Sequence, residues 1–386
     1  MRFAHLSDSH LGYKQLGIDE REQDVYGVFD KTIDKIIELD VDFVIHSGDL
    51  FDQSRPSTNS LLVFQRGLLK LQKAGIPMYA IAGNHDSVLR KNVKPPIALF
   101  EELGLNIIEP DKEFEVDGVL ICGIQFIPKY QKNGLLDILE EFSIIADDYD
   151  KSILVLHQGI GKFLPEDAYE LELNELPDNF NYYAMGHIHD FFIEDLGKGK
   201  LVFPGSLDMY RLNDNFKEFG KGFCVVDISG DVPEIERIRM ELPRKQLIET
   251  INYENFNEEL NDLVDRLKAE DEKPMLDLTV KGGDFDSSDI YEIILDAIGE
   301  HVLNIRPNFK PRRILEEESE IEEGEVLDPK TILKRKISEK YGMDEVTELS
   351  VDLLDMLSLK NIDEAKTLSE NFYNEHYAVK DDNGGE

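Results

Sequence analysis

Basic residues are scarce in this sequence. Its 386 residues include 42 lysines and arginines against 80 aspartates and glutamates, which gives a formal net charge of −38 at pH 7. This balance argues against non-specific attraction to nucleic acid, because that attraction depends on contacts from Lys and Arg to phosphate. We interpret the excess of acid as a solvated surface suited to a medium whose salt screens charge.

Long apolar runs and cysteines are scarce as well. No run approaches the roughly 18 apolar residues of a membrane span. Residues 1–13, MRFAHLSDSHLGY, lack the apolar core of a signal peptide and look like a first strand. Cys122 and Cys224 each lie in an apolar, strand-like stretch, where we expect buried, reduced thiols. We therefore expect a globular cytoplasmic protein with no membrane partner.

Strand and helix signals alternate over residues 1–230. Strand-like apolar stretches are followed by helical patterns at 21–38, 58–74 and 95–103, and the later stretches are rich in strands. This alternation predicts an α/β fold with a largely parallel sheet covered by helices. The later strands predict a second sheet packed beside the first.

The pattern changes near Pro243. The following unit has the order strand, helix, strand, helix, strand, and a run of acidic residues after it predicts a flexible linker. The helical segment beyond the linker is too short to hold much core alone, so we expect it to dock on a partner. The predicted division is a first domain, a small α+β unit, the linker, the helical segment and a disordered tail, at residues 1–240, 241–312, 313–328, 329–378 and 379–386.

Polar residues follow five of the predicted strands, in the stretches DSH, GDLFD, GNHD, LHQG and GHIHD. Because sites in open α/β sheets form at the carboxyl ends of the strands, we expect these residues to meet at one edge. A single histidine at a strand end is more often a core residue than a ligand, so the prediction depends on the whole set. Its members are Asp8, His10, Asp49, Asn84, His85, His157, His187 and His189.

Carboxylate, imidazole and amide oxygen together suit Mn²⁺, Fe²⁺ or Zn²⁺ better than Ca²⁺ or Mg²⁺. The set is too large for one ion that must also leave room for a substrate, and one carboxylate bridging two ions explains the number. Two such ions can clamp a phosphate ester and activate a hydroxide for in-line attack. We expect the remaining histidines to be structural or exposed: His5, His46, His301 and His376.

The five motifs in this order resemble the calcineurin-like metallophosphoesterase superfamily. The longer stretches HLSDSHLGY, HSGDLFDQSRPS and FPGSLD resemble, more narrowly, the nuclease subunit of archaeal double-strand-break repair complexes, which is related to bacterial SbcD. The resemblance covers residues 1–230. It implies an α/β (α+β sandwich) core of two packed mixed sheets flanked by helices in four layers, a DNA-capping domain at 241–312 and a C-terminal helical segment that binds a coiled-coil ABC-type ATPase.

The resemblance also implies two Mn²⁺ ions per subunit, with Mg²⁺ or Fe²⁺ less favoured. One ion would be held by Asp8, His10, Asp49 and His189. The other would be held by Asp49, Asn84, His157 and His187. Asp49 would bridge the two ions.

The same resemblance makes His85 a general acid or transition-state stabiliser facing the phosphate. The alternative is that His85 only supports the carboxylates. Asp86 and Asp190 would orient histidines. Many family members carry a histidine where this chain has Asp52, which puts a second catalytic histidine in doubt and favours a supporting hydrogen-bond acceptor there.

Basic and aromatic residues that follow the metal-site motifs are candidates for DNA contacts, and ordinary surface residues are the alternative. These candidates are Tyr13, Lys14, Arg55, Arg90, Lys91 and Lys94. The segments 61–71 and 95–103 are more apolar than one buried face requires. The resemblance implies that they form a homodimer interface, and simple packing on the sheet is the alternative.

The predicted function is that of a Mn²⁺-dependent DNA nuclease in double-strand-break repair. It would act as a 3′-to-5′ exonuclease on duplex DNA and an endonuclease on single strands, in a nucleoid-associated heterotetramer with the ATPase. The alternatives are another phosphoesterase of the superfamily, such as a protein phosphatase or cyclic-nucleotide phosphodiesterase, and a non-catalytic scaffold of the same fold. The C-terminal helices could instead form a self-packing tail.

Overall fold

A computed structural model describes residues 1–87, 93–165, 168–210, 218–312, 344–358 and 362–376, with the single residues 334 and 337. By its internal contacts the chain divides into two compact units. The first comprises Met1–Thr250, Asn257–Leu278 and Tyr291–Pro307, and the second comprises Ile251–Phe256, Thr279–Ile290 and Asn308–Glu386. This division does not follow the boundary predicted at residue 240, so the domain limits remain predictions.

The first sheet has six strands in the order β12-β11-β1-β2-β3-β4. Strands β1 to β4 run parallel, β11 pairs with β1 in the antiparallel direction, and β12 pairs with β11 in the antiparallel direction. Their bounds are β1 Arg2–Leu6, β2 Phe43–Ser47, β3 Met78–Ile81, β4 Leu105–Ile107, β11 Gly222–Asp227 and β12 Glu234–Arg239.

The second sheet also has six strands, in the order β5-β6-β7-β8-β10-β9. Its four central strands run parallel, and the two edge strands are antiparallel to their neighbours. The bounds are β5 Phe114–Val116, β6 Val119–Ile124, β7 Lys151–His157, β8 Tyr182–Gly186, β9 Phe192–Leu196 and β10 Gly199–Phe203.

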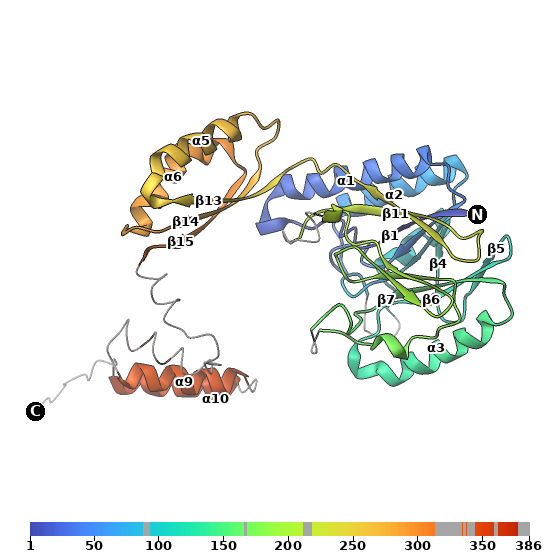
Figure 1. Cartoon of the computed structure of the whole chain (residues 1–386). Coiled ribbons are helices and arrows are strands. Elements are labelled where there is room, and N and C mark those ends of the chain that lie inside the picture. Colours follow the sequence, from blue (N-terminus) through green and yellow to red (C-terminus); the bar gives the residue numbers. More distant parts are fainter. Residues whose placement is uncertain are drawn as a thin grey trace, which may run out of the picture. The chain divides into compact units, whose positions relative to one another are not determined.

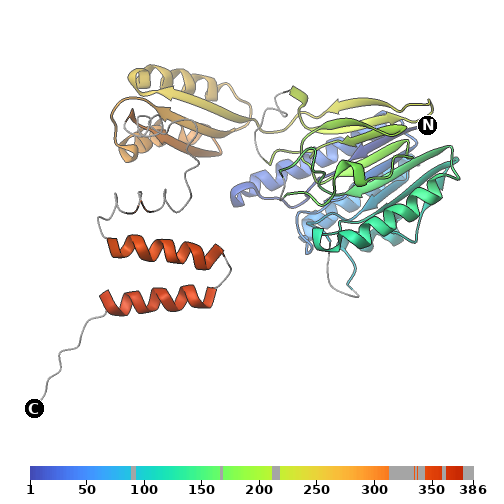
Figure 2. The same cartoon turned by 60° about the horizontal axis from the view of Figure 1, so that its bottom comes forward.

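Helices cover the outer faces of both sheets (Figures 1 and 2). The first sheet carries α1 Asp19–Glu38, α2 Thr58–Ala74 and the 3-10 helix η2 Pro96–Leu103, and the second carries α3 Lys132–Ala146. One apolar cluster joins the two sheets, and two others join each sheet to its helices. The predicted four-layer core of two mixed sheets is therefore confirmed, although α3 was not predicted.

Local sequence explains why α2 begins and ends where it does. Ser57 caps its start by accepting a hydrogen bond from the Ser60 amide at 3.1 Å. Gly75 ends it in the left-handed region, at a φ of 75°, which favours glycine. The predicted helix at 95–103 forms as the shorter 3-10 helix η2, which begins after Pro95.

The segment after residue 240 contains the predicted succession of strands and helices. It comprises β13 Gln246–Asn252, α5 Phe256–Lys268, β14 Met275–Lys281, α6 Ser287–Ile298 and β15 Asn304–Lys310, and its three strands form one sheet. Short 3-10 helices complete the elements so far: η1 Gln15–Gly17, η3 Lys129–Gln131, η4 Leu173–Glu175, η5 Tyr253–Asn255 and η6 Gly299–His301.

Two helices, α9 Asp344–Ser358 and α10 Ile362–His376, lie in the predicted C-terminal helical segment. The predicted linker at 313–328 and tail at 379–386 lie outside the described residues. Among the residues that are described, no helix is both long and apolar enough to cross a membrane. Cys122 and Cys224 are buried, unpaired thiols, as expected.

Candidate metal centre

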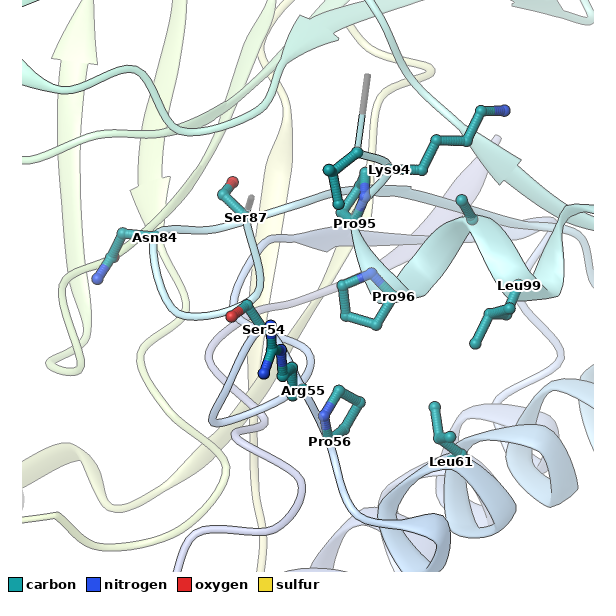
Figure 3. A pocket seen from close by; sticks show the side chains of 12 residues that line it. Ser54, Arg55, Pro56, Leu61, Asn84, Ser87, Lys94, Pro95, Pro96 and Leu99 are labelled. Atoms are coloured by element: carbon teal, nitrogen blue, oxygen red, sulfur yellow. The ribbon is translucent and has the colours of Figure 1, made fainter. Parts of the chain in front are cut away.

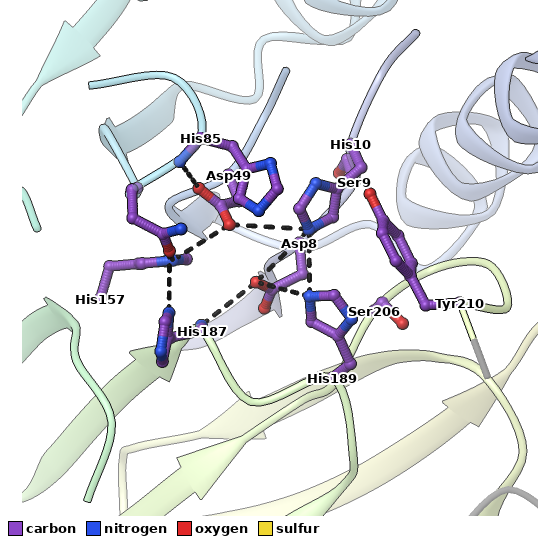
Figure 4. A network of polar contacts seen from close by, with 12 residues as sticks. Asp8, Ser9, His10, Asp49, His85, His157, His187, His189, Ser206 and Tyr210 are labelled. Carbon is purple, nitrogen blue, oxygen red and sulfur yellow. Dashed lines mark hydrogen bonds and ion pairs between the residues drawn. The ribbon is translucent and has the colours of Figure 1, made fainter. Parts of the chain in front are cut away.

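Five strand ends, three from the first sheet and two from the second, meet at one place (Figure 4). His157 is the last residue of β7, and the other predicted ligands follow the ends of β1, β2, β3 and β8 within four residues. Because the parallel strands of both sheets end on the same side, the two packed sheets together deliver all of these side chains. The predicted edge is thus formed by both sheets and not by one.

The backbone at this edge adopts unusual conformations. Four non-glycine residues have positive φ values: 51° at Asp8, 44° at His10, 53° at Asp49 and 83° at His187. Such conformations are sparsely populated and tend to gather at functional sites. Backbone hydrogen bonds of 3.0 Å from Asp8 N to Gly48 O and from His10 N to Asp49 O hold the first two loops together.

A first group of donor atoms lies around His10. Its Nε2 is 3.1 Å from Nε2 of His189 and 3.6 Å from Oδ2 of Asp49. Nε2 of His189 is in turn 3.7 Å from Oδ1 of Asp8. The structure therefore brings together the four residues predicted for the first ion.

A second group lies around Asn84. Its side-chain oxygen is 3.1 Å from Nε2 of His157 and 2.8 Å from Nδ1 of His187. Nε2 of His157 is also 3.3 Å from Oδ2 of Asp49. The same Asp49 oxygen therefore faces both groups, which is the arrangement that the prediction of a bridging carboxylate requires.

Supporting contacts fix the rings of the second group. The Ser47 carbonyl accepts a hydrogen bond of 2.8 Å from Nδ1 of His157, which leaves the lone pair of Nε2 free to bind. The ring of His187 stacks on Phe126, with an interplanar angle of 24°.

Glycines allow the strand ends to approach one another closely. A Cβ on Gly83 would lie 2.1 Å from Oδ1 of Asp49, and a Cβ on Gly48 would lie 2.3 Å from Nδ1 of His157. Neither distance is possible between real atoms, so only glycine permits these two loops to close around the site.

Burial makes the charges at this site costly. It raises the pKa of Asp8, and the nearby Asp49 carboxylate raises it further. Burial opposes the ionised form of His157, but Asp49 and Asp8 overcome this and raise its pKa to about 9. Burial lowers the pKa of His187 to about 3. Without a metal ion, a proton on Nε2 of His157 thus supplies positive charge beside the buried carboxylates, and a bound cation would replace this proton.

The donor set fits divalent cations. Oδ2 of Asp8 is buried and has no hydrogen-bond partner among the described residues, which costs free energy unless a cation compensates. The two groups of donors combine imidazole nitrogens with carboxylate and amide oxygens, and this mixture suits transition-metal ions.

His85 borders the cluster. Its backbone amide donates to Oδ1 of Asp49 at 2.8 Å, and its Nδ1 lies 2.9 Å from the carbonyl oxygen of Asp52. Its side chain is 40 % exposed, whereas that of His157 is fully buried. His85 is therefore the histidine at the strand ends that a substrate can reach most easily.

The three predicted supporting carboxylates have different surroundings. Asp52 lies against His10, with Oδ1 at 3.4 Å from Nδ1. Asp86 accepts hydrogen bonds from the backbone amides of Leu50, Phe51 and Gly83, so it contacts loop backbone and not a histidine ring in these bonds. Burial, together with the Asp49 charge, raises its pKa to about 7. Asp190 lies 4.0 Å from the buried Lys221 ammonium, which donates to the carbonyl of His189.

The histidines expected to be structural within the strands have their own partners. His5 contacts the Tyr182 hydroxyl and the Ser47 hydroxyl, each at 2.8 Å. His46 contacts the Ser9 hydroxyl at 2.7 Å. Burial lowers the pKa of both rings to about 3, so they are neutral packing residues at physiological pH.

The candidate DNA contacts are spread around the centre. Tyr13 stacks on Tyr210, with ring centroids 3.9 Å apart. Lys14 pairs with Asp19 at 2.7 Å. Arg55 and Lys94 line a cavity beside the centre, and Arg90 and Lys91 lie outside the described residues.

This cavity has a volume of about 1170 Å³ (Figure 3). Asn84 and Ser87 line it at the end near the metal centre, and Leu61 and Leu99 line it near α2 and η2. It therefore connects the polar cluster with an apolar part of the surface.

Sequence reasoning missed Tyr210. Its ring centroid lies 4.5 Å from those of both His10 and His189, and its hydroxyl donates to Asp52. Tyr210 follows the FPGSLD stretch by two residues, so the motif itself pointed to this loop although no side chain in it was chosen.

Comparison with known proteins agrees with the geometry. The family model for calcineurin-like phosphoesterases matches residues 1–191. The chain is 38 % identical to the DNA double-strand break repair protein Mre11 of Methanocaldococcus jannaschii over 268 residues, which cover 68 % of this chain and 72 % of that one.

Two further relatives carry the same name. That of Sulfurisphaera tokodaii is 37 % identical over 288 residues, which cover 73 % of each chain. That of Methanococcus maripaludis is 34 % identical over 315 residues, which cover 79 % of this chain and 82 % of that one. With identity at this level over more than two thirds of each chain, the protein belongs to the Mre11 family of calcineurin-like phosphoesterases.

Proposed function

We propose that the protein is a dimetal nuclease that hydrolyses phosphodiester bonds in DNA during double-strand-break repair. The observation that carries this proposal is the position of Asp49 Oδ2, 3.6 Å from Nε2 of His10 and 3.3 Å from Nε2 of His157. One carboxylate oxygen facing two separate donor groups is what a bridged pair of ions needs, and such pairs catalyse in-line displacement at phosphorus.

The proposed ligands follow the two groups of donors. One ion takes Asp8, His10, Asp49 and His189, and the other takes Asp49, Asn84, His157 and His187. Mn²⁺ is the proposed metal because the set mixes imidazole nitrogen with carboxylate and amide oxygen. When bound, the pair of ions supplies an activated water and stabilises charge on the phosphate.

His85 is the proposed general acid. Its Nδ1 lies on the Asp52 carbonyl, an acceptor, so Nδ1 carries a hydrogen in either protonation state. Nε2 then bears a proton only in the imidazolium form, and loss of that proton to the leaving oxygen gives a neutral ring that keeps its hydrogen bond to Asp52. The backbone hydrogen bond to Asp49 keeps His85 beside the bridge.

A panel of substrates tests this function. Labelled duplex DNA, labelled single-stranded DNA, a phosphopeptide and a cyclic nucleotide are each incubated with the protein and Mn²⁺. We expect hydrolysis of DNA alone, with release from 3′ ends of the duplex and internal cleavage of the single strand. Hydrolysis of the phosphopeptide or the cyclic nucleotide in preference to DNA would refute the assignment.

His85→Gln tests the role of the acid. The variant keeps every proposed ligand, so we expect unchanged Mn²⁺ binding and a loss of roughly 10²–10⁴-fold in DNA cleavage, the usual contribution of a general acid. Full cleavage by His85→Gln would remove this role. Asp49→Asn provides the contrast, because it should lose metal binding together with cleavage.

DNA is proposed to reach the centre through local positive charge. Arg55 and Lys94 line the cavity beside Asn84, and the metal ions add to the attraction. The acidic remainder of the surface then disfavours other binding modes. Lys14 is the weaker candidate, because its ammonium already pairs with Asp19 and Glu22.

A homodimer is part of the proposal. Leu62 and Leu69 on α2 and Leu99 on η2 are large apolar side chains that remain exposed, the last by 65 %. Residues of this kind on neighbouring elements favour burial against a second copy of the chain.

The C-terminal helices are proposed to bind the coiled-coil ABC-type ATPase and so complete a heterotetramer. Helices α9 and α10 contact each other, and Leu354 and Tyr373 on them are exposed. A hairpin of two helices with exposed apolar residues has little core of its own, so it gains stability from a partner.

A further inference from the structure

Tyr210 covers one side of the metal centre. Figure 4 shows its ring beside those of His10 and His189, and its centroid is 4.5 Å from the centroid of each. The ring also stacks on Tyr13. Both histidines belong to the group proposed for the first ion. Tyr210 therefore restricts how those two rings can turn.

The hydroxyl of Tyr210 acts on the same group through Asp52. It donates to Oδ1 of Asp52 at 2.9 Å, and this oxygen lies 3.4 Å from Nδ1 of His10. A carboxylate behind a histidine holds the hydrogen on the nearer nitrogen and leaves the other nitrogen free for a metal. For His10, the free nitrogen is the Nε2 that faces His189 and Asp49.

The position of Asp52 matters because His10 has no alternative partner. Nδ1 of His10 is buried and makes no hydrogen bond within the described part of the chain. Asp52 Oδ1 faces it at a distance longer than a normal hydrogen bond. A small shift of the Asp52 carboxylate therefore decides whether Nδ1 of His10 has a hydrogen-bond acceptor. The hydroxyl of Tyr210 holds this carboxylate in place.

Hydrogen bonds hold the segment that leads to Tyr210. Asp208, two residues earlier, is buried and accepts hydrogen bonds from Arg21 at 2.9 Å and from the Met209 amide at 2.6 Å. The Ser206 hydroxyl donates to the Asp208 carbonyl at 2.8 Å. Tyr210 is thus presented from a rigid base.

Tyr210 supports only one of the two groups of donor residues. The ring of Tyr210 contacts those of His10 and His189. Asp52, which accepts the Tyr210 hydrogen bond, also contacts His85 through its carbonyl oxygen. The rings of the other group are held by different partners, Ser47 for His157 and Phe126 for His187. A change at Tyr210 should therefore affect one metal position and spare the other.

We propose that Tyr210 is a positioning residue for the first metal ion, acting through Asp52 on His10. The proposal rests on the dimetal site described above and deepens it. It assigns to this chain a Tyr–Asp–His support on one side of the metal centre.

Stepwise binding of Mn²⁺ to the metal-free protein, measured by titration calorimetry, tests this role. The wild type should bind two ions in two steps. Tyr210→Phe keeps the ring and removes the hydroxyl, and it should weaken one step about 10–100-fold, the usual effect of losing a partner behind a metal ligand. Asn84→Ala should weaken the other step, which identifies the two positions.

Tyr183→Phe is the matched control, because the Tyr183 hydroxyl also makes a hydrogen bond, to the Pro177 carbonyl at 2.6 Å, away from the metal ligands. Both tyrosine variants should lose a similar amount of thermal stability without metal, and Tyr183→Phe should bind Mn²⁺ as the wild type does. If both steps are unchanged in Tyr210→Phe, or both weaken equally, the positioning role is wrong while the nuclease proposal stands. If the wild type binds no Mn²⁺, both proposals fall.

Discussion

Asp49 shows how much one side chain can depend on its neighbours. It lies in the left-handed region with a φ of 53°, and its carboxylate contacts a backbone amide and two imidazoles. Its conformation requires room that Gly83 provides, because any side chain there would overlap Oδ1 of Asp49. The geometry of the proposed bridge thus depends on Gly83, a residue without a side chain.

Gly83→Ala should therefore damage the metal centre. We expect Mn²⁺ affinity to fall at least about 10-fold, since displacing a ligand costs at least as much as losing the contact behind one. Gly27→Ala in α1 is the control, because a Cβ there meets nothing within 4 Å. It should raise the free energy of unfolding by about 0.5–1 kcal/mol. Calorimetry of metal binding and chemical denaturation measure the two effects, and unchanged Mn²⁺ affinity in Gly83→Ala would contradict the proposed packing.

Single residues also mark the limit of prediction from sequence. The proposed ligands could be found because each follows a strand end that glycine or aspartate marks, and parallel strands bring such ends together. Tyr210 could not be found in this way, because its partner Asp52 is 158 positions away in the chain and only folding brings the two side chains into contact. Asp86 was expected to orient a histidine, yet its contacts with three backbone amides follow from loop geometry that residue type does not reveal.

Among the elements, prediction succeeded where periodicity was long enough to read. The strand, helix, strand, helix, strand order after residue 240 is present as expected, and so are α1 and α2. Strands β4 and β5 have three residues each, too few for an alternating pattern to stand out. Helix α3 was overlooked, although its buried residues Leu135, Leu139 and Phe142 recur at helical spacing.

We predict that a single charge on the face formed by α2 and η2 disrupts the proposed homodimer. Leu99→Glu should convert dimer to monomer in light scattering coupled to size-exclusion chromatography, because it buries an unpaired charge at the interface. Ile144→Glu on α3 is the matched control, since the two side chains are 65 % and 66 % exposed. It should leave the mass unchanged. A dimer that survives Leu99→Glu would place the interface elsewhere.

The C-terminal helices make a separate prediction about the partner. Truncation after Gly324 removes α9 and α10 and should abolish binding to the ATPase in a pull-down, while Mn²⁺-dependent nuclease activity of the free protein persists. Truncation after Ala378 removes only the predicted tail, and this variant should bind normally. Retained binding after the longer truncation would favour the alternative of a self-packing tail.

The complete chain carries a net charge of −38, and this charge should make its stability depend on salt. Mutual repulsion of surface carboxylates opposes the compact state, and salt screens it. We expect the Tm of the metal-free protein to rise as KCl increases from about 0.05 M to about 1 M, over which the Debye length falls from more than 10 Å to about 3 Å. Scanning calorimetry measures this, and a Tm that falls with KCl would show that attractive ion pairs dominate instead.

The acidic composition of this protein disfavours DNA binding, whereas its motifs predict a DNA-cleaving site. The folded arrangement accounts for both. An acidic chain is a poor ligand for DNA as a uniform body. The proposed metal ligands nevertheless gather from both sheets at one edge, with Arg55 and Lys94 in the adjoining cavity. Attraction for phosphate is therefore expected where the chemistry occurs and not over the rest of the surface.

Anomalous diffraction from crystals soaked in Mn²⁺ tests the dimetal centre most directly. We predict two peaks per chain, about 3.5–4 Å apart, with the Asp49 carboxylate between them. Asp8, His10 and His189 should surround one peak and Asn84, His157 and His187 the other. A single peak would contradict the bridged pair, and so would a peak at the neighbouring group of His10, Asp52 and His85, whose donor atoms also lie within 4.8 Å of one another.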